Sequence, residues 1–193
     1  MQTNETYAQV ARLHAESINQ GFLPTLGVRF LALMYRAIDE CESAVLLIEE
    51  DNGCVIGFVS GASNMGAIYR KMLQHFLQLV MALLPSVVRP ARVWRILEII
   101  RYSRNSEGDG TLPAHELLSI AVAESHRGQG VAESLYQRLV EYFKAENVTE
   151  FRIVVGQSLT PAHRFYRRMG ALSVTEAEVH GGQRSTIYVH SVK

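Results

Sequence analysis

Residues 120–132 constrain the fold of this chain more than any other stretch, and their sequence is Ile-Ala-Val-Ala-Glu-Ser-His-Arg-Gly-Gln-Gly-Val-Ala. The pattern is that of a buried strand end, a polar turn, a glycine loop and the first turn of a helix. Gly128 and Gly130 lack a Cβ, so the backbone can turn tightly there and a ligand can approach it. The first N–H groups of a helix have no intrahelical partners and carry partial positive charge, which suits a phosphate or pyrophosphate. The alternative interpretation is a tight strand-to-helix turn without a ligand.

The flanking sequence predicts helices and strands on both sides of this loop. Apolar residues recur at helical spacing near the start of the chain, and the turn dipeptide Asn52-Gly53 separates two short apolar runs, which predicts a β-hairpin. The order strand, glycine loop, helix, strand predicts a right-handed crossover between parallel neighbours. The expected elements are helices over 7–19, 25–40, 131–146 and 161–169, strands over 44–48, 54–60, 114–122 and 151–155, and a last hairpin of 172–179 and 186–192 around Gly181-Gly182.

Residues 66–104 form an apolar stretch with seven basic residues and one acid, Glu98. The periodicity predicts one helix over 68–84, a break over 85–90 and a second helix over 91–102. One interpretation is two amphipathic helices that complete the core with their charges in solvent. The other is that basic, hydrophobic helices lie on a membrane surface or cover an anionic or acyl-bearing ligand.

Composition excludes several classes of protein. Nineteen Lys and Arg balance nineteen Asp and Glu, so there is no overall basic surface for nucleic acid. Cys41 and Cys54 stand apart without His/Cys ligand spacing, and we expect neither a metal site nor a disulfide framework. The first residues lack a basic stretch followed by an apolar one, and the longest apolar run is too short for a bilayer. The expectation is a cytoplasmic protein.

Two motifs occur in order, separated by a predicted helix and strand. Arg127-x-x-Gly130-x-Ala132 matches the pattern (Gln/Arg)-x-x-Gly-x-(Gly/Ala), and residues 162–170 match Ala-x-x-Phe-Tyr-x-x-x-Gly. Together they resemble the GNAT superfamily of acyl-CoA N-acyltransferases. Over about residues 44–192 the resemblance implies an α+β fold, with a mixed, mostly antiparallel central sheet flanked by helices and splayed in the middle. We expect a single N-acetyltransferase-like domain over 1–193, in which 66–104 is a helical insertion.

The resemblance also implies which residues hold acetyl-CoA. Backbone N–H groups of the glycine loop would bind its pyrophosphate, and the Arg127 side chain would either add a charged contact or point to solvent. The pantetheine arm would pair with the strand before the loop. Family members often carry Asn before the second motif, whereas this chain has Ser158 and Thr160, either of which would supply a hydroxyl. The expected cofactor-binding residues are Ile120, Ala121, Val122, Arg127, Gly128, Gln129, Gly130, Val131, Ala132 and Ser158.

The same resemblance implies two catalytic residues. Tyr166 stands where many members carry the tyrosine that protonates the leaving thiolate, and a phenol is protonated at neutral pH. Glu116 resembles the position of the catalytic glutamate in one branch of the superfamily. A carboxylate in a partly apolar site can serve as the base, because its pKa is raised there. Its neighbour His115 lies on the opposite face of the strand and is the alternative base, and a water relay without a dedicated base is a third possibility.

These residues predict an N-acetyltransferase that moves an acetyl group from acetyl-CoA to a primary amine of a small molecule or peptide. Neither motif contains cysteine, which favours direct attack in a ternary complex over a covalent intermediate. The alternative function is a coenzyme A-binding module whose basic helical insertion docks a membrane or protein partner, with little catalysis. The sequence leaves the acceptor and the oligomeric state open, and the basic insertion hints at an anionic acceptor.

Overall fold

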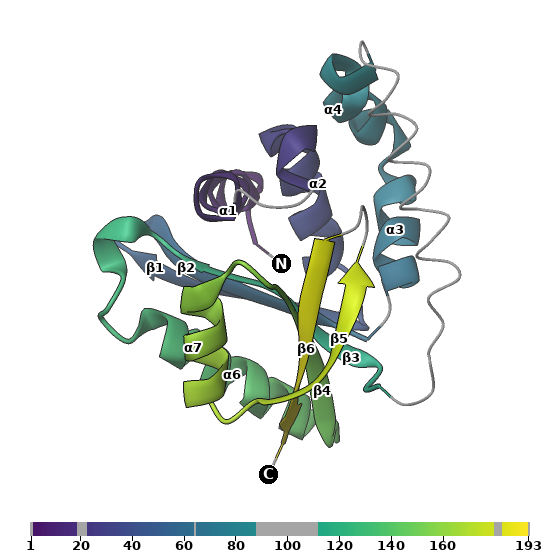
Figure 1. Ribbon diagram of the computed structural model, residues 1–193. Coiled ribbons are helices and arrows are strands. Elements are labelled where there is room, and N and C mark those ends of the chain that lie inside the picture. Colours follow the sequence, from purple (N-terminus) through teal and green to yellow (C-terminus); the bar gives the residue numbers. More distant parts are fainter. Residues whose placement is uncertain (1, 19–22, 64, 88–111, 180–182, 193) are drawn as a thin grey trace.

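The computed structural model describes residues 2–18, 23–63, 65–87, 112–179 and 183–192. In these residues six strands form one sheet with the order β1-β2-β3-β4-β6-β5 (Figure 1). The strands are β1 Ala44–Asp51, β2 Cys54–Ala62, β3 His115–Val122, β4 Glu150–Gly156, β5 Leu172–Val179 and β6 Gln183–Ser191. The helices are α1 Asn4–Ser17, α2 Val28–Asp39, α3 Met65–Gln74, α4 Phe76–Val87, α6 Val131–Ala145 and α7 Thr160–Arg168, with short 3-10 turns at Leu23–Leu26 and Glu124–His126.

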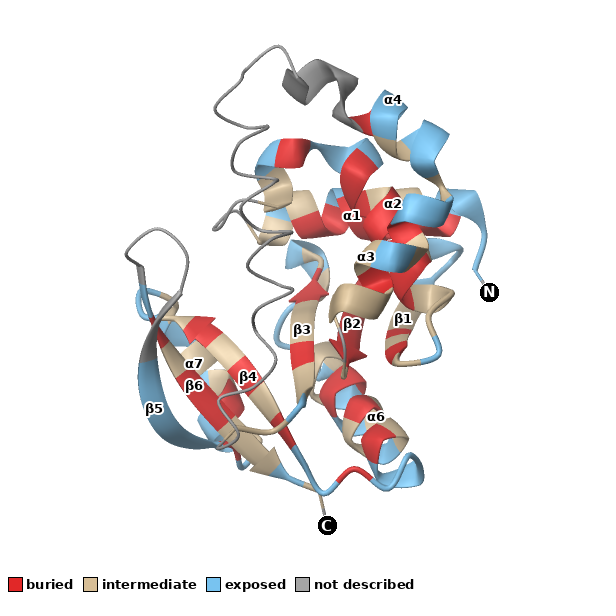
Figure 2. Ribbon diagram, turned by 90° about the vertical axis from the view of Figure 1, so that its right-hand side faces the viewer, coloured by how far each residue is buried: buried red, intermediate tan, exposed pale blue. Residues whose placement is uncertain are grey.

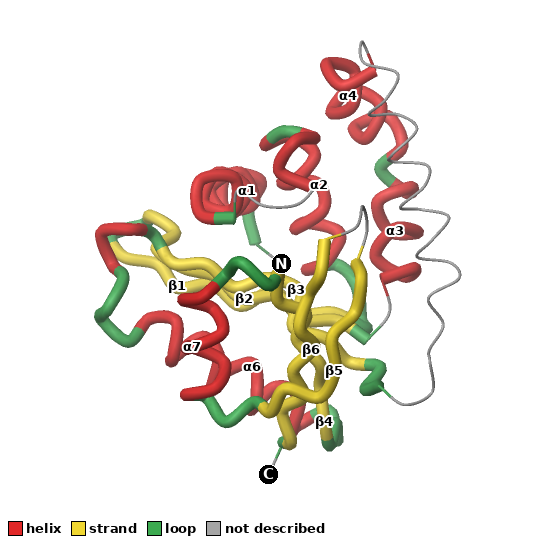
Figure 3. The backbone as a smooth tube through the Cα atoms, viewed as in Figure 1, coloured by secondary structure: helices red, strands yellow, loops and turns green. Residues whose placement is uncertain are grey.

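The sheet is mixed and mostly antiparallel, as the sequence predicted. β3 and β4 are parallel neighbours, joined through the glycine loop and α6, and the other strand pairs are antiparallel. Helices α1 and α2 lie on one side of β1–β3, while α6 and α7 lie on the other side of the sheet (Figure 3). Each side has its own core: Tyr35 and Phe58 are central to the first, and Tyr136 and Phe151 to the second.

Two glycines on β2 let α6 pack directly against the sheet. A Cβ at Gly61 would lie 2.9 Å from Phe143 Cζ and 3.0 Å from Leu139 Cδ1. A Cβ at Gly57 would lie 2.9 Å from Leu135 Cδ1. These distances are shorter than ordinary contacts, so the helix that follows the glycine loop reaches its position because β2 has no side chains there.

The helices of residues 65–87 differ from the prediction in two respects. The predicted single helix over 68–84 is interrupted at His75, which separates α3 from α4, whereas the predicted break at Pro85 lies within α4. At the interruption, His75 Nε2 lies 3.0 Å from Glu40 Oε2, just after α2. The predicted helix over 91–102 and the turn at Gly181-Gly182 lie outside the described residues. In the described part of the chain, no helix has the length and apolar character needed to cross a bilayer.

Candidate functional site

β3 and β4 separate at the centre of the sheet. Their parallel pairing covers three positions: His115 with Phe151, Glu116 with Arg152, and Leu117 with Ile153. Beyond Leu117, β3 continues to Val122 beside β2 alone, and Figure 2 shows β3 and β4 diverging. The splayed middle strands that the sequence predicted are therefore present, and one edge of β3 is open over its last five residues.

The open edge of β3 presents backbone groups that a ligand can pair with. The Ala123 N–H donates to Ile56 O of β2 at 2.8 Å. Because N–H groups alternate between the two sides of a strand, those of Val122 and Ile120 point away from β2, toward the opening. The carbonyl of Val122 faces the same way and accepts a hydrogen bond from Arg127 Nε at 3.2 Å. Arg127, although exposed, thus contacts the open edge.

A β-bulge lies where the opening begins. Ser60 of β2 pairs with Ser119, and the next residue, Gly61, pairs with Leu117, so Leu118 is an extra residue in β3. A bulge leaves one residue of the ladder unpaired and turns the strand. On the side of α1 and α2, Ser119 hydrogen-bonds to Tyr35. The pattern of apolar residues alone gave no signal for this bulge, because Leu117 and Leu118 are both apolar.

The glycine loop has the backbone geometry that its sequence predicts. Gly128 and Gly130 have φ of +76° and +82°, in the left-handed region that favours glycine. The Ser134 N–H donates to Gly130 O at 2.9 Å, so the N–H groups of the three preceding residues lie at the open end of α6. The Gln129 side chain donates to Ser125 O at 3.0 Å, which braces the loop. Together these features make an anion-binding end beside the opening in the sheet.

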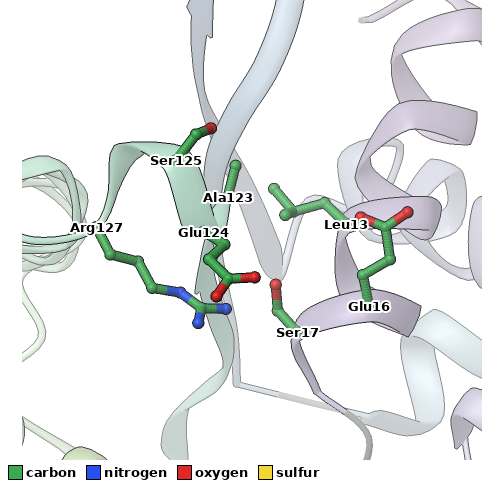
Figure 4. Close-up of a pocket in the computed structure, with 7 residues that line it drawn as sticks. All are labelled: Leu13, Glu16, Ser17, Ala123, Glu124, Ser125 and Arg127. Carbon is green, nitrogen blue, oxygen red and sulfur yellow. The ribbon is translucent and has the colours of Figure 1, made fainter.

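A pocket of about 560 Å³ lies between α1 and the loop after β3 (Figure 4). Arg127 and Glu124 extend into it from the loop, and Leu13 and Ser17 point toward them from α1 (Figure 4). Leu13, Glu16 and Ser17 were missed by the sequence analysis, since they belong to no motif and lie far from the glycine loop in sequence. The lining residues are Leu13, Glu16, Ser17, Ala123, Glu124, Ser125 and Arg127.

Glu116 lies at the last paired positions of β3 and β4, just before the strands separate. Arg152 Nε donates to its Oε2 at 2.9 Å. Burial raises the pKa of Glu116, and the charge and hydrogen bond of Arg152 oppose that rise. His115 faces the other side of the sheet, where its ring lies 5.6 Å from that of Phe143, and burial lowers its pKa. The two candidate bases are thus on opposite faces, as predicted.

Tyr166 lies on α7, in the core shared with α6. It is buried, and its ring is 6.2 Å from that of Tyr136 and 6.3 Å from that of Tyr188. Burial raises its pKa well above the ordinary value, so the phenol stays protonated. Leu117 belongs to the same core, so Tyr166 and Glu116 lie on opposite faces of the sheet. Ser158 is exposed in the loop before α7.

A strand with one open edge, next to an anion-binding helix end, defines a site for an extended and anionic ligand. The acetyltransferase (GNAT) family matches residues 15–171. The chain therefore belongs to this family and is an acetyl-CoA-dependent acyltransferase. No curated protein sequence matches the chain. Within the described ranges, no group of three or more His, Cys, Asp or Glu side chains could hold a metal ion.

Solved structures with the same fold include several acetyltransferases. An N-acetyltransferase from Staphylococcus aureus Mu50 is 15% identical, with a TM-score of 0.64, over 100% of this chain and 96% of that one. The ribosomal-protein-S18-alanine N-acetyltransferase from Escherichia coli is 11% identical, with a TM-score of 0.60, over 100% and 91%. Arabidopsis thaliana NAA60 in complex with acetyl-CoA is 19% identical, with a TM-score of 0.58, over 97% and 94%. At these low sequence identities, the similarity to the solved structures establishes the fold alone.

Proposed function

We propose that the chain transfers the acetyl group of acetyl-CoA to a primary amine of a small molecule or peptide, by direct attack in a ternary complex. The observation that carries the proposal is the open edge of β3 beside the glycine loop. That arrangement places an unpaired strand edge next to an anion-binding helix end, which suits a thioester cofactor with amides along its arm and a pyrophosphate at one end. The complex of Arabidopsis NAA60 with acetyl-CoA, a protein of the same fold, supports this choice of donor.

The donor would be held by backbone groups. N–H groups at the start of α6, from Val131 on, bind the pyrophosphate, because they carry partial positive charge and have no helical partner. The N–H groups of Val122 and Ile120 pair with the amides of the pantetheine arm, which then extends the sheet by one strand in place of β4. Ala121, between them, points its side chain into the core of α1 and α2. Ser158 supplies a hydroxyl contact from the loop before α7.

The acetyl carbonyl would lie beside the bulge at Leu118. A backbone N–H released from the ladder there stabilises the negative charge that develops on the carbonyl oxygen. The amine nitrogen forms a bond to the carbonyl carbon, and the bond from that carbon to sulfur breaks. Neither Cys41, after α2, nor Cys54, in the β1–β2 hairpin, belongs to this part of the fold. Direct attack therefore fits better than an acyl-enzyme.

Two side chains would move the protons. Glu116 accepts the proton that the amine loses, either directly or through water, and its raised pKa makes it a stronger base than an exposed carboxylate. Tyr166 donates its phenolic proton to the departing thiolate. Glu116 is favoured over His115 because the His115 ring packs against Phe143 on the α6 side of the sheet, whereas Glu116 lies where β3 and β4 begin to separate.

A thiol-release assay with acetyl-CoA and a panel of amines tests this function. The expected result is release of coenzyme A that depends on both the enzyme and one class of amine. With the best amine, Glu116→Gln should lower kcat by about 100-fold, the lower range for general base catalysis. It should also remove the part of the low-pH decline that comes from protonation of Glu116, while the part that comes from protonation of the amine remains. Glu49→Gln, which alters another carboxylate paired with an arginine, is the matched control. Acetyl-CoA binding without turnover on any amine would instead favour the coenzyme A-binding module.

A further inference from the structure

Helix α4 has an unusual surface for an outlying helix. Between Phe76 and Val87 it contains no charged residue. Leu79 and Ala82 pack against the core of α1 and α2. The opposite face is also apolar, and together with Leu73 at the end of α3 it makes a continuous exposed stripe. The stripe consists of Leu73, Phe76, Leu77, Val80 and Met81, whose exposed fractions are 55%, 63%, 75%, 40% and 53%.

The spacing of the stripe is that of a contact surface. Within α4, Leu77 and Met81 are four residues apart, as are Phe76 and Val80, so these four side chains lie along one side of that helix. Leu73 is exposed at the end of α3, just before the turn at His75. Figures 1 and 2 show α4 at the edge of the molecule, beyond α2 and away from the sheet. A helix that is apolar on all sides is normally buried, and contiguous exposed apolar surface marks an interaction site.

Charge identifies the kind of partner. Arg70 and Lys71 lie on α3, beside the beginning of the stripe. Residues 66–104 contain seven basic residues and one acid, whereas the remaining chain contains twelve basic and eighteen acidic residues. The chain as a whole is neutral, but its charge is strongly divided, and the apolar stripe belongs to the positive part. A partner that is both apolar and negatively charged fits this combination.

We propose that the outer face of α3 and α4 docks on an anionic lipid bilayer. The apolar stripe would enter the boundary between headgroups and acyl chains, and Arg70 and Lys71 of α3 would contact the headgroups. With 12 residues, α4 is only about 18 Å long at 1.5 Å per residue, so it lies in the surface and does not cross the bilayer. A second copy of this chain fits less well, because a symmetric interface would place two positive segments face to face. The proposal goes beyond acetyl transfer and does not depend on it.

Vesicle co-sedimentation of the full chain tests the proposal, with phosphatidylcholine vesicles compared to mixed phosphatidylcholine and phosphatidylserine vesicles. The wild type should bind the mixed vesicles in a salt-sensitive manner. Leu77→Ser with Met81→Ser should weaken that binding by about ten-fold or more, because two largely exposed side chains lose their burial in lipid. The matched control is Leu172→Ser with Val174→Ser, which alters equally exposed apolar residues on β5 and should leave binding unchanged.

A charge variant separates the two parts of the surface. Arg70→Glu with Lys71→Glu should weaken binding to mixed vesicles by roughly five-fold or more per residue, with no effect on any weak binding to phosphatidylcholine alone. Circular dichroism verifies that each variant is folded.

Three results would overturn the proposal: no binding to either vesicle, binding that the Leu77 and Met81 changes leave intact, or a dimer in gel filtration that those changes dissociate. The last would assign the stripe to a second copy.

Discussion

Replacement of His14 by glutamine removes a buried titratable group from the core beneath the sheet. His14 is 2% exposed, and its Nδ1 lies 2.5 Å from the Tyr35 hydroxyl. Tyr35 in turn hydrogen-bonds to Ser119, next to the bulge in β3. The His14 ring also stacks on Phe58, at 6.3 Å. Burial lowers the pKa of His14 from 6.5 to about 4, so the folded protein holds this ring neutral.

The lowered pKa makes stability depend on pH. The unfolded chain protonates His14 near pH 6.5, whereas the folded chain protonates it near pH 4. Between those values the unfolded state takes up the proton, so the free energy of unfolding falls as the pH falls. Integrated from pH 7.5 to pH 5, the loss from this residue is about 2 kcal/mol. That is a large part of the roughly 5–15 kcal/mol by which a domain is usually stable.

Urea denaturation followed by circular dichroism at pH 7.5 and pH 5 measures this loss. The wild type should lose about 2 kcal/mol more than His14→Gln between the two values, since glutamine does not titrate. Other buried histidines contribute equally to both proteins and cancel in the difference. Val10→Ala, which alters another buried residue of α1 and leaves His14 in place, is the control and should retain the pH dependence of the wild type. An equal loss in wild type and His14→Gln would refute the reasoning, because His14 would then not be held neutral by the fold.

Two further predictions concern the sheet and the site. Gly61→Val should lower the free energy of unfolding by about 1–3 kcal/mol, because its side chain collides with Phe143 and Leu139; a thermal melt that matches the wild type would contradict the close packing of α6. Tyr166→Phe should lower kcat with the best amine by about 100-fold through loss of the proton donor, with acetyl-CoA affinity kept within about two-fold of the wild type. Unchanged turnover would leave Tyr166 a packing residue.

Local patterns accounted for most of the fold. Asn52 has φ of +50° and Gly53 of +78°, the turn geometry expected for that dipeptide, and the β1–β2 hairpin follows. The glycine loop and its two positive-φ glycines were also predictable, because their conformation depends on the residues themselves. The position of the loop at the mouth of the open sheet required the family resemblance as well.

Features that depend on distant contacts were not predictable. Periodicity continued through His75, whereas the chain breaks between α3 and α4 at this residue, where its side chain contacts Glu40. Pro85 was expected to end a helix, yet α4 continues past it to Val87. The pairing of Glu116 with Arg152 depends on the register of two strands. The approach of Ser17 to the glycine loop depends on how α1 lies across the sheet.

Isothermal titration of acetyl-CoA into Gly130→Val tests the central claim, that the glycine loop binds the donor. A Cβ at Gly130 meets no atom within 4 Å, so in the proposed complex the new side chain fills the space that the pyrophosphate occupies. Gly27→Val is the matched control: Gly27 also caps a helix with positive φ, and a Cβ there also meets no atom within 4 Å. We predict that Gly130→Val loses affinity by at least about ten-fold, since the close backbone approach is lost. Gly27→Val should lose stability but keep its affinity. Equal affinity in Gly130→Val and the wild type would contradict the account.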